Sequence, residues 1–395
     1  MRLDSLTARA IPDSRGKPTV EATLVSGERA ASASVPSGKS TGAHEAKELR
    51  DPDGGVSTAI AHIGNEIAEA LASRDFASAE EVDKLLIELD GTADKSRLGA
   101  NAILAVSMAA ARLFATERGT PLWKSIAERA GTSPSAPRLF VNLVNGGTHA
   151  GFRLPFQEHL LVIGGDLRGA YSVAKRAYEA LGTRLGSVPM GDEGGYAPMF
   201  EKLDEPFVLL AELVKELPGT SLAIDAAANE LRHGDGYQLL GRDYSSEELA
   251  NVYRELAERF PLHSIEDPFG EDAHAEFAGL TTSFGSSPLV VGDDLTVTDP
   301  ARIRSSAQAK EITAVVVKPN QIGTVSEAIS AVSAARAAGL APICSHRSGE
   351  TMDTFIADFA YGTASHGIKA GGLGQKERLA KYERLVRIEE EARAS

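Results

Sequence analysis

The pattern of apolar and polar residues changes near residue 130. Before that point, residues 19–25 (TVEATLV) and 31–35 alternate in the manner of strands. Apolar residues then recur at helical spacing, which predicts helices near 56–73, 78–89 and 99–118. Strands followed by a run of helices indicate an α+β domain over residues 1–130, and the Ser/Pro-rich segment 131–137 (GTSPSAP) indicates a linker.

From residue 138 onward, short apolar segments recur at intervals typical of alternating strands and helices. Strands are expected first at 138–144 and 155–162. Later apolar segments each end at a polar or charged residue: Asp225, Glu266, Asp293, Lys318, His346 and Lys369. The intervals of 41, 27, 25, 28 and 23 residues between these ends leave room for a loop, a helix and a return loop.

The helices between these strands carry recognisable end signals. Ser245 or Ser246 and Asp299 are candidate N-caps, and Gly339 is a candidate C-cap. Residues 138–395 are therefore predicted to form a closed α/β barrel of the TIM type, preceded by the smaller α+β domain. The alternative is an open doubly wound sheet, which normally has a glycine-rich phosphate turn after its first strand, and this sequence has none there.

Composition and charge narrow the range of functions. The 395 residues are 43% hydrophobic and 24% charged, as in a soluble globular protein. With 41 basic and 55 acidic residues the net charge is −14, which disfavours nucleic acid and anionic membranes as partners. The single cysteine, Cys344, excludes an internal disulfide, and no segment resembles a secretory signal or a membrane span. We therefore expect a cytoplasmic protein.

Acidic residues at successive strand ends suggest a metal site. In a barrel the C-terminal ends of the strands converge on one open mouth, where Asp225, Glu266 and Asp293 would meet. Such an oxygen-only site suits Mg²⁺, and no Cys or His pair has the spacing of zinc ligands. A single acidic residue at a strand end is more often a helix cap or a solvated loop group, but three in succession favour a metal site.

Two later strand ends carry lysines, and a third carries a possible anion site. Lys318 and Lys369 could simply extend to water, or could serve as bases if nearby cations reduce their proton affinity. Residues 346–350 (HRSGE) offer a guanidinium and a hydroxyl for a phosphate or carboxylate. The alternative for this segment is a helix N-terminus capped by Ser348.

Other chemically suggestive residues lie in loops and in one apolar strand. Glu158 interrupts an apolar strand, where a carboxylate is costly unless it is paired or functional. Glu193 lies in a glycine-rich loop and could be a general acid or an ordinary turn residue. His149 lies in another glycine-rich turn, where a histidine is more often a surface or packed residue. The segment 37–41 (SGKST) resembles the end of a P-loop but lacks its first glycine, and Cys344 has no evident orienting acid, so we expect it in the core.

Several segments, taken together, resemble the enolase family. They span nearly the whole chain: IPDSRGKPTVEATL, VPSGKSTG, LGANAILAVSMAAA, VNGGTHAG, FQEHLLV, GDEGGYAP, SIEDPF, VGDDLTVTDP, KPNQIGT, SHRSGETMDTFIAD and ERLAKYERLVRIEEE. The resemblance implies an enolase-type barrel with an irregular start. It also implies a hydro-lyase of glycolysis and gluconeogenesis that interconverts 2-phosphoglycerate and phosphoenolpyruvate plus water, with two Mg²⁺ ions per active site and an enolate intermediate that they stabilise.

The resemblance further implies a role for each candidate residue. One Mg²⁺ would be bound by Asp225, Glu266 and Asp293, and the second by Ser40, in a mobile loop near residues 37–42. Lys318, made neutral by the nearby cations, would remove the C2 proton. Glu193, kept protonated by neighbouring carboxylates and helped by Glu158, would protonate the departing C3 hydroxyl. The substrate-binding residues would be His149, Gln157, Glu158, His346, Arg347, Ser348 and Lys369.

The chain also departs from the usual family pattern. Lys39 stands beside Ser40, where we expect it to slow loop closure or to add a phosphate contact. Pro319 should keep Lys318 extended, and residues 370–376 (AGGLGQK) differ from the family's usual version. Because the family is typically dimeric or larger, we expect a homodimer or higher homo-oligomer. The alternatives are another metal-dependent lyase of the superfamily, or a surface-binding role with incidental catalysis.

Overall fold

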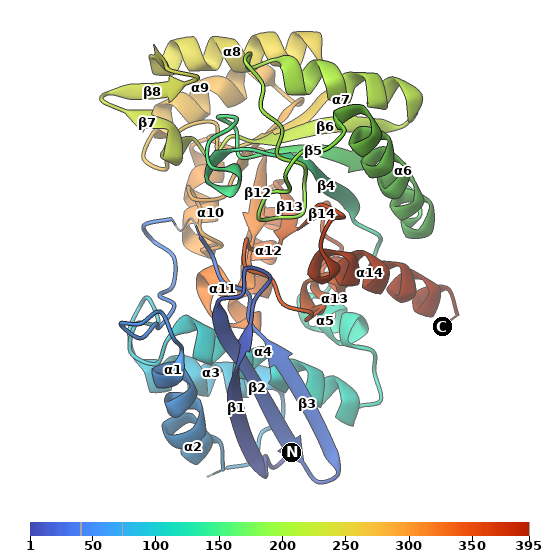
Figure 1. The fold of residues 1–395 in the computed structure, drawn as a ribbon. Helices are drawn as coiled ribbons and strands as arrows, with labels where there is room; N and C mark the ends of the chain where they lie inside the picture. The colour runs from blue at the N-terminus through green and yellow to red at the C-terminus, as the bar shows by residue number, and fades with distance from the viewer. Residues whose placement is uncertain (40–41, 73, 395) are drawn as a thin grey trace.

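The computed structural model describes residues 1–39, 42–72 and 74–394. An N-terminal unit, blue to cyan in Figure 1, lies beside a larger barrel unit. Its antiparallel sheet has the order β1-β2-β3, and its helices follow along the chain. The elements are β1 (Ser5–Pro12), β2 (Pro18–Ser26), β3 (Arg29–Ser34), α1 (Ser57–His62), α2 (Ala68–Ala72), α3 (Ala79–Asp90), α4 (Ala100–Glu117) and α5 (Leu122–Ala130).

The expected strands and helices of this unit are confirmed, but helix α5 (Leu122–Ala130) was not expected. A π-helical turn over Ile63–Ile67 joins α1 to α2. Strand β1 was not expected, because most of its side chains are exposed or half-buried and its alternation is weak. No helix or strand lies between α5, which ends at Ala130, and β4, which begins at Arg138, and the domain boundary at 131–137 stays a prediction.

Helix α4 connects the two units of the molecule. It is apolar on nearly every face because it packs on β2 and β3 on one side and on barrel helices on the other. Its one charged residue in the buried stretch, Arg112, donates two hydrogen bonds of 2.6 Å to Asp353 of the barrel unit. The arginine that interrupts the apolar sequence thus forms an ion pair between the N-terminal unit and the barrel unit.

The predicted closed barrel is confirmed. Its strands are β4 (Arg138–Asn145), β5 (Glu158–Ile163), β6 (Thr220–Asp225), β10 (Leu262–Glu266), β11 (Leu289–Gly292), β12 (Ala314–Val317), β13 (Ala341–Ser345) and β14 (Gly367–Gly371). Strand β5 runs antiparallel to both neighbours, β4 and β6, while the other pairs are parallel. This arrangement is the irregular start, and it still places Glu158 opposite Asp225 at the mouth.

Helices lie around the outside of the barrel. They are α6 (Leu167–Leu185), α7 (Glu205–Glu216), α8 (Ser246–Arg259), α9 (His274–Phe284), α10 (Pro300–Gln308), α11 (Pro319–Ile322), α12 (Val325–Ala337), α13 (Phe355–Gly362) and α14 (Lys376–Ala394). Ser245 and Asp299 cap α8 and α10 as expected. A small sheet that was not expected follows β6: β7 (Arg232–His233), β8 (Gly236–Leu239) and β9 (Arg242–Tyr244).

The barrel interior is filled with apolar side chains, so the functional pocket can form only at the mouth. The side chains packed inside are Phe140, Leu160, Val162, Ala223, Val291, Ala314, Val316 and Ile343. Above this apolar layer, at or directly after the C-terminal ends of parallel strands, stand polar residues such as Asp225, Asp293 and Lys318. Across the described residues, no helix is long and apolar enough to cross a membrane.

Candidate active site

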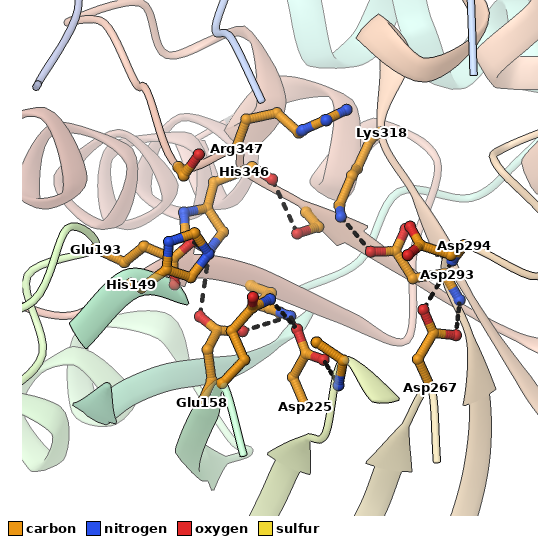
Figure 2. Close-up of a pocket in the computed structure, with 15 residues that line it drawn as sticks. His149, Glu158, Glu193, Asp225, Asp267, Asp293, Asp294, Lys318, His346 and Arg347 are labelled. Carbon is orange, nitrogen blue, oxygen red and sulfur yellow. Dashed lines mark hydrogen bonds and ion pairs between the residues drawn. The ribbon is translucent and has the colours of Figure 1, made fainter. Parts of the chain in front are cut away.

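A pocket of about 480 Å³ opens at the C-terminal mouth of the barrel. Most of the predicted site residues line it: His149, Gln157, Glu158, Glu193, Asp225, Asp293, Lys318, His346, Arg347, Ser348 and Lys369. Glu266 is buried next to the pocket without lining it, and Ser40 lies outside the described residues. Figure 2 shows Glu193 and His149 on one side of this pocket and Lys318 and Asp293 on the other.

Lys369 lies among three carboxylates. Its Nζ is 2.8 Å from Oδ2 of Asp225 and 2.8 Å from Oε1 of Glu266, and it also pairs with Glu158. Burial opposes the charge of Lys369, but Asp225 and the other carboxylates raise its pKa well above the usual value. An ammonium group thus holds these carboxylates together at the ends of β5, β6 and β10.

Lys318 pairs with Asp293 on the opposite side of the pocket. Its backbone is extended, with φ −124° and ψ 107°, as expected for a residue before proline. Burial disfavours the ammonium form, but the charge of Asp293 outweighs it and raises the pKa of Lys318. The protein groups alone therefore keep this lysine protonated, and the neutral form expected beside bound cations stays a prediction.

Two carboxylates that sequence reasoning missed also line this side. Asp267 accepts hydrogen bonds from the backbone N–H groups of Asp293 (2.9 Å) and Asp294 (2.8 Å). Burial and the neighbouring aspartates raise the pKa of Asp267 well above its usual value and that of Asp294 to about 7. The signal that could have revealed them is the second acidic residue that follows Glu266 and Asp293 directly in SIEDPF and GDD.

The charges of the lining favour a bound cation. Six carboxylates line the pocket, from Glu158 to Asp294, against the cationic Lys318, Arg347 and Lys369. Burial, with the charge of Asp225, raises the pKa of Glu266 well above its usual value, which shows how costly another negative charge is here. Hard divalent cations prefer such oxygen donors and would offset the excess charge.

Two groups of described residues bring three ligand atoms within 4.8 Å of one another. They are Asp267–Asp293–Asp294 and Glu158–Glu193–His346. The predicted set Asp225, Glu266 and Asp293 is not such a group, and lysine ammonium groups lie against each of these carboxylates. The donor chemistry thus fits a divalent cation, and the particular ligand set stays a prediction.

A buried acid–base cluster occupies the other side of the pocket. Asn142 Nδ2 donates to Oε1 of Glu158 (2.7 Å) and to Oε2 of Glu193 (3.2 Å). His149 Nε2 is 3.4 Å from Oε1 of Glu193, and His346 Nε2 is 3.6 Å from Oε1 of Glu158. These contacts bring Glu158, Glu193, His149 and His346 together as predicted, and add Asn142.

The two glutamates differ in proton affinity. Burial and the charge of Glu193 raise the pKa of Glu158. Burial also favours protonation of Glu193, but the charge of His149 and a hydrogen bond from Glu158 lower its pKa to about 2. Of the two, Glu158 therefore has the higher proton affinity, whereas the proton was expected on Glu193. Coupled carboxylates titrate as a pair, so Glu158 is the candidate proton donor at this side of the pocket.

The predicted anion-binding segment is an irregular loop. Helix α13 begins only at Phe355, so the alternative of a helix capped by Ser348 is wrong. Arg347 Nη1 donates to Oε2 of Glu45 at 2.8 Å, and a Cβ added to Gly38 would overlap its guanidinium. A glycine at position 38 is needed because the N-terminal unit passes directly over Arg347.

The remaining sequence candidates have structural explanations. A P-loop needs a helix directly behind it, and in the described residues after position 41 the first helix begins only at Ser57. Burial raises the pKa of Cys344 to about 12, which fits the expected core residue. Lys39 Nζ donates to the Thr148 carbonyl and to Oδ2 of Asp192, both at 2.7 Å.

Sequence comparisons agree with this architecture. The family described as "Enolase, N-terminal domain" matches residues 3–126, and "Enolase, C-terminal TIM barrel domain" matches residues 134–395. An enolase from Methanopyrus kandleri is 42% identical, covering 99% of this chain and 96% of that protein. An enolase from Thermococcus kodakarensis is 41% identical (98% and 95% covered), and enolase B from Dictyostelium discoideum is 40% identical (99% and 95%). The chain is therefore an enzyme of the enolase family.

Proposed function

We propose that this enzyme interconverts 2-phosphoglycerate and phosphoenolpyruvate plus water. The observation that supports the proposal most strongly is the placement of an amine, Lys318, across one pocket from a coupled carboxylate pair, Glu158 and Glu193. Removal of a proton and departure of a hydroxyl from adjacent carbons need a base and an acid on different sides of the substrate.

Lys318 is the proposed base for the C2 proton. It must give up its own proton before it can act, and its pairing with Asp293 opposes this. The competing charge of Arg347 and Lys369 acts in the other direction. Any group that takes over the charge of Asp293 therefore makes Lys318 a better base.

The Glu158–Glu193 pair is the proposed acid for the C3 hydroxyl. Hydroxide is a poor leaving group, so a proton must reach the departing oxygen. Asn142 holds both carboxylates, and His149 and His346 lie against them. A substrate oxygen that entered between these groups could accept a proton from Glu158, the member of the pair with the higher proton affinity.

Divalent cations, proposed to be two Mg²⁺, would offset the excess negative charge of the carboxylates that line the pocket. When bound, they would offset the negative charge that develops on the substrate carboxylate during proton removal. Asp225, Glu266 and Asp293 are the proposed protein ligands of one ion, and Ser40 of the other. Lys369 would then exchange contacts with protein carboxylates for one with the substrate carboxylate.

Arg347 and Ser348 are the proposed phosphate receptors. The guanidinium of Arg347 is buried beside Glu45, and Arg15 Nη1 donates to the Ser348 hydroxyl at 3.1 Å. Arginine recognises phosphate through parallel hydrogen bonds, which suits this pre-positioned group. His149 and Gln157, which line the same pocket, complete the proposed substrate contacts.

The test is formation of phosphoenolpyruvate from 2-phosphoglycerate, followed by ultraviolet absorbance with Mg²⁺ and with chelator. We expect turnover with Mg²⁺ only, and loss of C2 proton exchange with solvent in Lys318→Ala. Exchange retained in this variant would overturn the base assignment. A panel of non-phosphorylated carboxylates serves as the control, and equal turnover of these acids would favour another lyase of the superfamily.

A further inference from the structure

Arg378, at the start of α14, is a fully buried arginine that reaches the active-site loop. Its Nη1 contacts Nδ1 of His346 and donates to the Arg347 carbonyl at 2.7 Å. Its Nη2 donates to the Ser348 carbonyl at 2.8 Å. The guanidinium therefore binds three consecutive residues of the loop behind the pocket, and it is not itself among the residues that line the pocket.

The contact with His346 determines which ring nitrogen carries the proton. A guanidinium has hydrogen-bond donors and no acceptor, so Nδ1 of His346 must accept. A neutral imidazole with an accepting Nδ1 carries its proton on Nε2. Nε2 points to the acid pair, 3.6 Å from Oε1 of Glu158 and 3.9 Å from Oε1 of Glu193.

The charged groups around His346 support the same protonation state. Arg378 faces it from α14 and Lys369 lies near it on β14, while Glu158 and Glu193 face it from the other side. Burial and the charge of Arg378 lower the pKa of His346 well below its usual value, and the carboxylates do not reverse this. A neutral ring with one defined donor remains.

We propose that Arg378 is a positioning residue that holds His346 as the neutral Nε2–H tautomer, with its N–H facing the Glu158–Glu193 pair. The effect on catalysis rests on the proposed function, in which this pair supplies the proton to the leaving hydroxyl. In the other tautomer, a bare Nε2 would face the carboxylates and compete for their proton. Arg378 would thus reserve that proton for the substrate.

The tautomer can be measured without any assay of activity. The ¹⁵N chemical shifts of selectively labelled histidines distinguish the two neutral tautomers from the imidazolium, and His346→Gln assigns the signal. We expect a neutral His346 with its proton on Nε2 across the pH range in which the enzyme stays folded. An imidazolium, or a proton on Nδ1, at neutral pH overturns the proposal even if the enzyme is an active hydro-lyase.

Variants test the catalytic consequence. Arg378→Met should convert His346 to a mixture of tautomers and lower kcat about 10- to 100-fold, the range typical of groups that orient a functional residue. Arg378→Lys keeps a hydrogen-bond donor and should restore the Nε2–H tautomer in part. This variant keeps the proposal testable if Arg378→Met does not fold. Arg384→Met is the matched control, since this α14 arginine pairs with Asp358 away from the pocket and should leave kcat unchanged.

A double-mutant cycle separates positioning from general support of the loop. His346→Gln keeps an N–H donor near the position of Nε2 but has no tautomers. If Arg378 acts through His346, Arg378→Met should cost much less in the His346→Gln background than in the parent. Equal losses in both backgrounds would show that Arg378 acts only through the carbonyls of Arg347 and Ser348, and would refute the proposal.

Discussion

Replacement of Lys369 by methionine tests the electrostatics of the pocket. Lys369 Nζ contacts Asp225, Glu266 and Glu158, and all four side chains are buried. Methionine preserves much of the volume and removes the charge, so three carboxylates lose their common partner. Loss of one partner of a buried ion pair typically costs about 3–5 kcal/mol. In a barrel of this size, each 1 kcal/mol corresponds to about 2–4 °C, so we expect Tm to fall by about 6–20 °C.

The assay is thermal unfolding by calorimetry at pH 7.5 in chelator, for Lys369→Met and the parent. The carboxylates of the variant will bind protons more tightly when folded than when unfolded. The penalty should therefore be smallest at low pH and should grow as the pH rises through their range. Arg184→Met is the control, because Arg184 pairs at the surface with Glu216 and such pairs contribute about 1 kcal/mol or less. A Tm loss in Lys369→Met no larger than in this control, or one independent of pH, would refute the charge argument.

Further predictions concern the close contact between Gly38 and Arg347, the buried His159 and Cys344. Gly38→Ala should lose most activity and lower Tm, because the added Cβ displaces the Arg347 guanidinium from its buried partner Glu45; unchanged steady-state kinetics would contradict this. Burial lowers the pKa of His159 to about 4 from 6.5, so its neutral form stabilises the fold at neutral pH, and about 3 kcal/mol is lost as the pH falls from 6.5 through 4. Urea unfolding at several pH values should therefore show a weaker acid destabilisation in His159→Gln, and an identical pH dependence would disprove it. Cys344, whose pKa burial raises to about 12, should react with a thiol reagent at pH 8 only upon unfolding; rapid labelling of the native enzyme would contradict its burial.

Much of the fold could be predicted because its signals are local. Periodicity predicted helices α1 to α4 of the N-terminal unit but not α5. Ser245 and Asp299 marked helix starts, since caps depend on residues within one turn. The apolar segments that end at Asp225 and Glu266 end where strands β6 and β10 end, whereas β14 continues past Lys369 to Gly371. The spacing of such segments is enough to predict a closed barrel. Strand β1 was not predicted because most of its side chains are exposed or half-buried, and the strands β7 to β9 were not predicted because they are short.

Several of the predicted site residues that line the pocket lie at or next to strand ends, and the others, such as His149 and Glu193, lie in loops. Which of them pair was decided only in three dimensions. Lys369 and Asp225 are 144 positions apart, and their contact exists because barrel closure brings β14 and β6 to one mouth. The difference in proton affinity between Glu158 and Glu193 likewise depends on tertiary structure, because His149, a residue from another loop, lowers the pKa of Glu193.

Residue types and their order along the chain thus determined the barrel, the family and the chemical groups available at its mouth. The tertiary structure alone revealed Asp267, Asp294 and Arg378 as parts of the site. The physical reason is that periodicity and capping act within a few residues, whereas burial and charge pairing depend on neighbours that the chain reaches only after folding.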